Sequence, residues 1–187
     1  MTVVGTGIGG YNGDDIPATE AMIQYPYGIF VTEQDELYFA DYCNSRIRKV
    51  FNGIVTTVAG TGIDGYNGDG QLAMNTQLND PWFVTVVSGE VYIAEYDNNR
   101  IRKILRNGII TTLAGTDGYN VDGISATSVQ LSSPNCVFVT NNGEMFISTI
   151  AGYAGVGIPG YSGDVPFDFQ KYIRTSIIHD EATTPKA

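Results

Sequence analysis

A repeat of about 55 residues limits the possible folds of this chain more than any other feature. Gly5-Thr6-Gly7-Ile8 returns as Gly60-Thr61-Gly62-Ile63. The sequence Gly-Tyr-Asn-Gly-Asp follows both copies, at residues 10–14 and 65–69. An eroded copy begins at Gly115, and a short echo lies at residues 160–164. Each unit of such a repeat should form the same supersecondary structure and pack against its neighbours.

Four further blocks recur at the same spacing. They begin at Pro26, Glu36, Asn44 and Asn52, and their second copies begin at Pro81, Glu90, Asn98 and Asn107. The first two blocks return a third time, at Pro134 and Glu144. Aligned blocks at one spacing indicate a repeated structural unit.

Each unit predicts four short strands. In the first unit they are residues 29–32, 37–40, 46–51 and 54–59. The second is apolar throughout, which fits a strand buried on both faces, and the fourth is rich in β-branched residues. Asn52-Gly53 and Asn107-Gly108 join strands three and four, and Asn-Gly favours a type I′ hairpin turn. The glycine-rich stretch of about 20 residues after Gly60 reads as a connection to the next unit.

Repeated units of four antiparallel strands predict an all-β fold made of β-propeller blades. The blocks resemble NHL repeats, a family of six-bladed propellers in the TolB-like superfamily, and the long glycine-rich connection is similar to bacterial and teneurin-type members. The resemblance rests on residues 28–31, 37–41 and 44–48 and on their second copies. The histidine of the Asn-His-Leu signature is absent, because the chain has Asn44-Ser45-Arg46 and Asn98-Asn99-Arg100 there.

The length of the chain corresponds to fewer blades than a closed propeller ring contains. At 55 residues per blade, 187 residues make about 3.4 blades, whereas propellers use about four to eight. We expect a propeller fragment over residues 1–165, with blades at 25–60 and 80–115, a truncated blade at 133–152, and a non-repeat, frayed tail at 166–187. The favoured interpretation is a fragment of a longer protein. An incomplete gene product and a short protein that associates to complete a ring are the alternatives.

The candidate site residues flank the turn between strands two and three. Asp41 and Arg46 recur there as Glu95 and Arg100. They could form a repeated charged rim for a ligand, but the favoured interpretation is a structural turn motif. In that motif Asn44 or Asn98 holds the turn, and the acid pairs with the arginine across the hairpin.

The basic third strands raise the question of nucleic acid binding. Arg46-Ile47-Arg48-Lys49 should lie toward the outside of its blade, so we expect solvated arginines with acids nearby. The aromatic side chains fall where a core needs them and do not alternate with the basic ones. The net charge of −10 also opposes the phosphate backbone, so no nucleic acid partner is favoured.

The sequence offers few candidate metal-ligating or catalytic residues. Residues 64–70 contain closely spaced Asp and Asn, but their spacing does not match an EF-hand, and tight glycine turns explain them better. The one histidine, His179, lies outside the repeat, and neither Cys43 nor Cys136 has a histidine partner in the pattern. We therefore predict no catalytic residues, no metal and no cofactor.

The sequence favours a binding module that presents loops to a protein or peptide partner, with possible self-association through exposed blade faces. The alternative is part of a propeller enzyme, of the lyase or lactonase type that the resemblance includes, whose metal residues lie in other blades. No apolar run approaches the ~20 residues of a membrane helix, and no secretion signal is visible, so the expected compartment is the cytoplasm by default.

Overall fold

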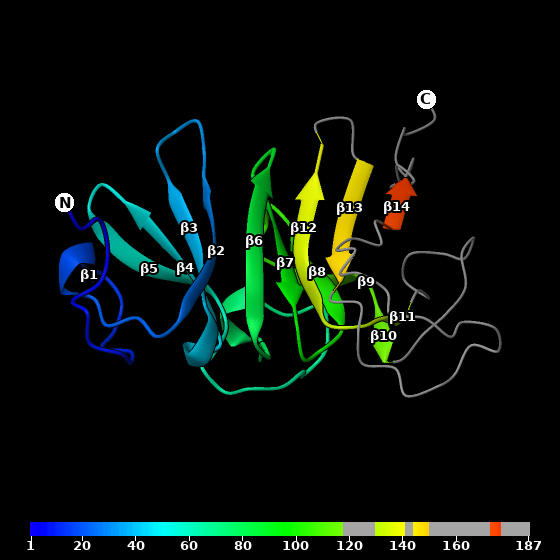
Figure 1. Ribbon diagram of the computed structural model, residues 1–187, viewed down its shortest axis with the longest axis horizontal. Helices are drawn as coiled ribbons and strands as arrows, with labels where there is room; N and C mark the ends of the chain where they lie inside the picture. Colours follow the sequence, from blue (N-terminus) through cyan, green and yellow to red (C-terminus); the bar gives the residue numbers. More distant parts are fainter. Residues whose placement is uncertain (118–129, 141–143, 150–172, 177–187) are drawn as a thin grey trace, which may run out of the picture.

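The computed structural model describes residues 1–117, 130–140, 144–149 and 173–176. Within these ranges the chain forms antiparallel sheets that follow one another along the long axis of the molecule (Figure 1). The helical segments of the described residues are three single 3₁₀ turns: η1 (Ala18–Glu20), η2 (Tyr42–Asn44) and η3 (Ala73–Asn75). In these ranges no helix has the length and apolar character needed to cross a membrane.

The first sheet confirms the predicted four-stranded unit. Its strands are β2 (Pro26–Val31), β3 (Leu37–Asp41), β4 (Arg46–Phe51) and β5 (Ile54–Ala59). They pair in chain order, and β1 (Ile16–Pro17) adds a short fifth strand beside β5. The start of β2 lies three residues before the expected one, because pairing with β3 extends back to Pro26, and the other strand ends agree with the expected bounds to within one residue.

The second sheet repeats the first. Its strands are β6 (Pro81–Val87), β7 (Glu90–Glu95), β8 (Arg100–Ile104) and β9 (Ile110–Ala114). The register also repeats, since Glu95 stands opposite Arg100 as Asp41 stands opposite Arg46. Equivalent residues therefore occupy equivalent places in the two blades.

The third sheet corrects the interpretation of residues 166–187 as a frayed tail. β12 (Pro134–Val139) and β13 (Glu144–Thr149) are the two expected strands. β14 (Ile173–Ser176) pairs with β13 and supplies a third strand from within the predicted tail. The rest of that stretch lies outside the described residues, as does the echo at 160–164. A short parallel pair, β10 (Thr116–Asp117) and β11 (Gln130–Leu131), connects the second and third blades.

The two Asn-Gly hairpins differ from each other. Asn52 and Gly53 have φ of 51° and 76°, as the predicted type I′ turn requires. At the second hairpin only Gly108 has a positive φ, and its N–H bonds the carbonyl of Leu105. Arg106 is the reason: it is one extra residue in this copy, so the loop becomes a longer turn that ends on a left-handed glycine.

The sheets stack face to face and bury the apolar side chains between them. One core cluster joins residues of the first sheet, such as Ala40 and Ile47, to Val84 and Ile93 of the second. Another joins the second sheet to the third. The innermost strands β2, β6 and β12 are neighbours in space (Figure 1). The chain is thus all-β and built of propeller blades.

Gly28 makes the close approach of the first two innermost strands possible. A Cβ atom at this position would lie 2.7 Å from Cα of Phe83 and 2.8 Å from the carbonyl oxygen of Trp82. Real Cβ atoms do not come so near to backbone. Gly28 thereby sets the spacing between β2 and β6 at the start of both strands.

Candidate functional site

A buried cluster of charges lies inside the first blade. The Arg48 side chain is fully buried, and its guanidinium forms ion pairs with Asp41 at 3.3 Å and with Asp14 at 3.1 Å. Asp41 was expected to pair with Arg46, which stands directly opposite on β4, and that expectation is wrong. The expectation of a solvated Arg48 is wrong for the same reason, because this arginine and not Arg46 turns toward the acids.

The second blade contains the same cluster. Arg102 is fully buried and contacts Glu95 at 3.5 Å and Asp69 at 2.9 Å. Asn98 donates from Nδ2 to Glu95 and to the carbonyl of Gly65, both at 2.8 Å. Asn44 makes the matching bonds in the first blade, to Asp41 and to the carbonyl of Gly10. Asp41 and Glu95 thus act inside the blades and form no exposed rim.

Arg46 closes the turn on which it lies. Its guanidinium donates to the carbonyls of Asn44 and Thr61 at 2.8 Å and lies 3.8 Å from the centre of the Tyr11 ring. Arg100 repeats this placement over Tyr66, at 4.2 Å. A guanidinium over an aromatic face is attracted by the ring, so each arginine fastens a glycine-rich connection to a blade.

The recurring Gly-Tyr-Asn-Gly-Asp connection has a structural role in this arrangement. Its tyrosine stacks on the arginines, and its aspartate pairs with the buried one. Asn67 holds the loop in shape, since its side chain accepts from the Gln77 N–H and donates to the Asn75 carbonyl. The loop geometry agrees with the preferred explanation by tight turns, because Gly65, Gly68 and Gly70 all have positive φ.

The two buried acids differ in how well they are satisfied. Asp41 accepts hydrogen bonds from the Gln24 N–H, from Asn44 and from Arg48. Glu95 accepts from Asn98, while its Oε1 has no hydrogen-bond partner among the described residues. Burial therefore raises the pKa of Glu95 to about 7, against the opposing effect of Arg102.

A group of aromatic side chains lies at the start of the innermost strands, on the outside of the cores. Trp82 stacks on Tyr27 at a centroid distance of 4.4 Å and on Tyr96 at 5.0 Å, and Tyr42 meets Tyr27 and Trp82 edge-on. Tyr27 is 38% exposed, and the other three are half-buried. These four residues together with Asp80 are called the aromatic–acidic surface below.

Asp80 gives this surface its charge. It accepts a hydrogen bond of 2.7 Å from the Tyr42 hydroxyl. Partial burial raises the pKa of Asp80, with neighbouring Asp97 and Asp64 acting in the same direction and the Tyr42 bond against it. Burial and the same carboxylate raise the pKa of Tyr42. Carboxylates beside stacked rings form an environment that favours a cation.

The sequence interpretation missed this surface because it placed all the aromatic residues in the core. Tyr27 and Trp82 occupy the same repeat position, directly after the proline that starts the innermost strand, and Tyr42 and Tyr96 occupy another. The alternation along β2 could have shown it, since Gly28 separates Tyr27 from the strand's remaining apolar residues.

Among the described residues no group of three or more His, Cys, Asp or Glu side chains could hold a metal ion. Cys43 is an exposed free thiol and Cys136 a partly buried one, and burial raises the pKa of both. A raised pKa lowers the fraction of thiolate, which is the nucleophilic form. His179 lies outside the described residues.

Comparison with known families identifies the repeat. Residues 78–104, which run from the connection through β6 and β7 into β8, match the model of the NHL repeat. This segment is similar to an NHL repeat. The matched residues span the part of the blade that carries Glu95, Asn98 and Arg100, so the NHL signature covers the turn that the buried charges hold together.

A curated protein that this chain resembles is Protein SUPPRESSOR OF QUENCHING 1, chloroplastic, from Arabidopsis thaliana. It is 29% identical over 97 residues, which are 50% of this chain and 9% of the plant protein. The likeness is therefore to one stretch of a much longer protein.

Two solved structures show the same fold. A protein of unknown function from Bacteroides thetaiotaomicron VPI-5482 has a TM-score of 0.58 at 22% identity, over 65% of this chain and 32% of that one. An auxiliary nutrient binding protein from Bacteroides ovatus ATCC 8483 has a TM-score of 0.55 at 18% identity, over 70% and 36% of the two chains. This chain spans about a third of either structure.

Proposed function

We propose that this chain is a propeller module that binds a protein or peptide partner, and that the partner presents arginine or lysine side chains to the aromatic–acidic surface. The observation that carries the proposal is the stack of Tyr27, Trp82 and Tyr96 beside Asp80. Exposed Tyr and Trp are the residues that dominate binding energy at protein interfaces.

The chemistry of the surface selects the partner. A guanidinium can stack on the exposed face of Tyr27 while it pairs with the carboxylate of Asp80. The formal net charge of −10 attracts cationic ligands over a distance and disfavours acidic ones. A basic peptide segment fits these properties better than an acidic or purely apolar one.

Trp82 is the only tryptophan of the chain, so its fluorescence reports on this surface alone. The test is a titration with a synthetic Gly-Arg repeat peptide, with a Gly-Glu peptide of the same length as the control ligand. We expect a saturable change with the basic peptide, and at least about tenfold weaker binding for Tyr27→Ala and Asp80→Asn.

Phe138→Ala is the matched control variant, because Phe138 is an exposed aromatic residue of β12 outside the surface. It should bind as the unaltered chain does. Equal binding of both peptides, or unchanged binding by Tyr27→Ala, would contradict the proposal. Hydrolysis of a lactone by the purified chain would instead favour the enzyme alternative.

A further inference from the structure

Four Asn-Gly pairs lie within the described residues, and they begin at Asn12, Asn52, Asn67 and Asn107. A fifth pair, at 142–143, lies outside them. In an Asn-Gly pair the main-chain nitrogen of the glycine can attack the side-chain amide of the asparagine, because glycine has no Cβ to obstruct the approach. The attack closes a five-membered succinimide ring. The four pairs differ in what opposes the formation of this ring.

The pairs in the glycine-rich connections are held by their side chains. The amide of Asn67 donates to the Asn75 carbonyl at 3.0 Å and accepts from the Gln77 N–H at 2.9 Å. Asn12 makes the same two kinds of bond in the first connection, at 2.9 and 2.7 Å. Both bonds must break before either amide can turn toward the glycine that follows it.

The pair at Asn107 is held at the attacking nitrogen. The N–H of Gly108 donates to the Leu105 carbonyl at 2.8 Å, and the side-chain oxygen of Asn107 accepts from the Ile109 N–H at 3.1 Å. The attack requires that the glycine nitrogen lose its proton. At Gly108 this loss would remove a main-chain hydrogen bond, so the fold opposes the reaction here too.

Asn52 has none of these restraints. Asn52 and Gly53 are both exposed. Among the described residues, neither the Asn52 side chain nor the peptide group between Asn52 and Gly53 has a hydrogen-bond partner. Asn52 is also the one asparagine of the four pairs with a positive φ, of 51°. The hairpin between β4 and β5 therefore leaves both reacting groups free.

The turn at Asn52 is one peptide rotation away from the reactive geometry. The ring closes when Cβ of the asparagine and the nitrogen of the glycine lie on the same side of the Cα–C bond, which requires a ψ of about −120°, as at the first central residue of a type II′ turn. Type I′ and type II′ turns share the positive φ at that residue, and both join two strands of a hairpin. A flip of the single peptide group between Asn52 and Gly53 converts one turn into the other, and glycine accepts the negative φ that results.

We propose that Asn52 is a site of spontaneous conversion to isoaspartate, and that the conversion releases η1 from the first blade. The Gly53 nitrogen forms a bond to Cγ of Asn52 and the bond from Cγ to the amide nitrogen breaks, so ammonia leaves with the proton of the Gly53 N–H. Water then adds to the main-chain carbonyl of the ring and opens it there. The main chain now runs through the former side chain and is one methylene longer.

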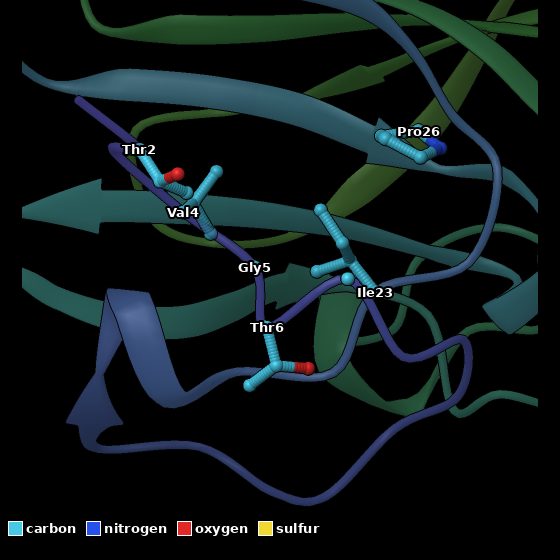
Figure 2. A pocket seen from close by; sticks show the side chains of 7 residues that line it. Thr2, Val4, Gly5, Thr6, Ile23 and Pro26 are labelled. Atoms are coloured by element: carbon cyan, nitrogen blue, oxygen red, sulfur yellow. The ribbon is translucent and has the colours of Figure 1, made fainter.

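The Gly53 carbonyl is the group through which this change reaches η1. It accepts the N–H of Ala18 at 2.8 Å, and the Ala18 carbonyl accepts the N–H of Gly5 at 2.9 Å. Gly5 lies beside a hollow of about 440 Å³ that Ile23 also lines (Figure 2). A longer main chain at residue 52 no longer fits a two-residue turn, so the Gly53 carbonyl moves and Ala18 loses its bond to the blade.

The order of reaction among the pairs is the first test. The full chain is incubated in mildly alkaline buffer and sampled over time by peptide mass mapping, which detects the exchange of a side-chain amide for a carboxyl group. We expect Asn52 to convert at least about tenfold faster than Asn12, Asn67 and Asn107, whose hydrogen bonds must break first. In concentrated urea the four rates should become similar. Similar rates in the folded chain, or the same order in urea, would overturn the inference.

The stability of the converted chain tests the release of η1. Converted chains carry one more negative charge and are isolated by anion exchange, and their isoaspartate content is measured by enzymatic methylation of the isoaspartyl carboxyl group. We expect the urea midpoint of unfolding to fall as this content rises. Asn52→Asp is the matched control, because it has the same charge on a main chain of ordinary length, and it should unfold as the unaltered chain does. An isoaspartate-rich fraction that unfolds like Asn52→Asp would show that η1 stays in place.

Discussion

Among single residues, Arg48 depends most on its neighbours, because its charge is buried and must be paired. Its guanidinium is fully buried with Asp41 and Asp14, although neighbouring Lys49 keeps its ammonium at the surface beside Glu36. Charges removed from water are costly unless they are paired, so each member of this cluster is required by the others.

Removal of Arg48 should therefore be severe. We expect Arg48→Met to lower the free energy of unfolding by about 3–5 kcal/mol, because it leaves Asp41 buried without its cation. Lys49→Met is the control on the same strand and should cost less than about 1 kcal/mol. Urea unfolding measures both values, and similar losses for the two variants would show that the buried pair is not formed.

Glu95 should make stability depend on pH. Its pKa in the folded chain is about 7, against 4.5 for the ordinary side chain. Between these values the folded state holds a proton that the unfolded state has released, so the free energy of unfolding falls as pH rises.

The loss from this one group should be about 1–3 kcal/mol between pH 4.5 and 7.5. Glu95→Gln, which keeps the Asn98 contact but cannot ionise, should lose less over the same range. Asp41→Asn gives the comparison in the first blade. Parallel pH profiles for the unaltered chain and Glu95→Gln would rule out Glu95 as the cause.

At the scale of single elements, Gly28 allows β2 and β6 to lie close together. A side chain there would overlap the backbone of β6 at Trp82 and Phe83, which cannot move aside without disturbing two blades. The repeat equivalents of Gly28 are Phe83 and Cys136, so the requirement for glycine arises only between the first two blades.

Gly28→Ala should destabilise the chain by about 1–3 kcal/mol and shift the fluorescence of Trp82. Gly9→Ala is the control, because a Cβ there meets only the flexible Gln24 side chain at 3.5 Å and the backbone has an ordinary φ. Thermal unfolding followed by tryptophan emission measures both effects. An unchanged emission spectrum in Gly28→Ala would show that β2 and β6 are further apart than described.

Blade stacking decides which repeat positions become core. Ile29 and Val84 are equivalent in sequence, yet Ile29 is 65% exposed and Val84 fully buried. The difference arises because the first sheet covers the second, while among the described residues the N-terminal segment alone covers part of the first.

Val84→Lys should cost more than about 3 kcal/mol, because it places an unpaired charge between two sheets. Ile29→Lys should cost less than about 0.5 kcal/mol at concentrations where the chain is monomeric. Urea unfolding of dilute samples gives both values. A large cost at Ile29 under those conditions would mean that another part of the same chain covers this face.

Much of the fold follows from the sequence alone. Strands β3, β4 and β5 lie within one residue of their expected bounds, because local alternation and Asn-Gly turns are properties of neighbouring residues. The repeat itself assigns equivalent elements to both blades. The repeat also predicts a turn between Asp41 and Arg46, whereas the partner that Asp41 takes there, Arg48, does not follow from it.

Contacts between distant residues decided the rest. The partner of Asp41 is Arg48 and not the arginine opposite, since Asp14 from the preceding connection completes a buried cluster that local spacing does not reveal. Likewise β14 joins the third sheet from outside the repeat pattern. Two equivalent repeat positions can also differ in burial, as Ile29 and Val84 do. Their burial depends on whether a neighbouring sheet covers them, and only the stacking of the blades decides this.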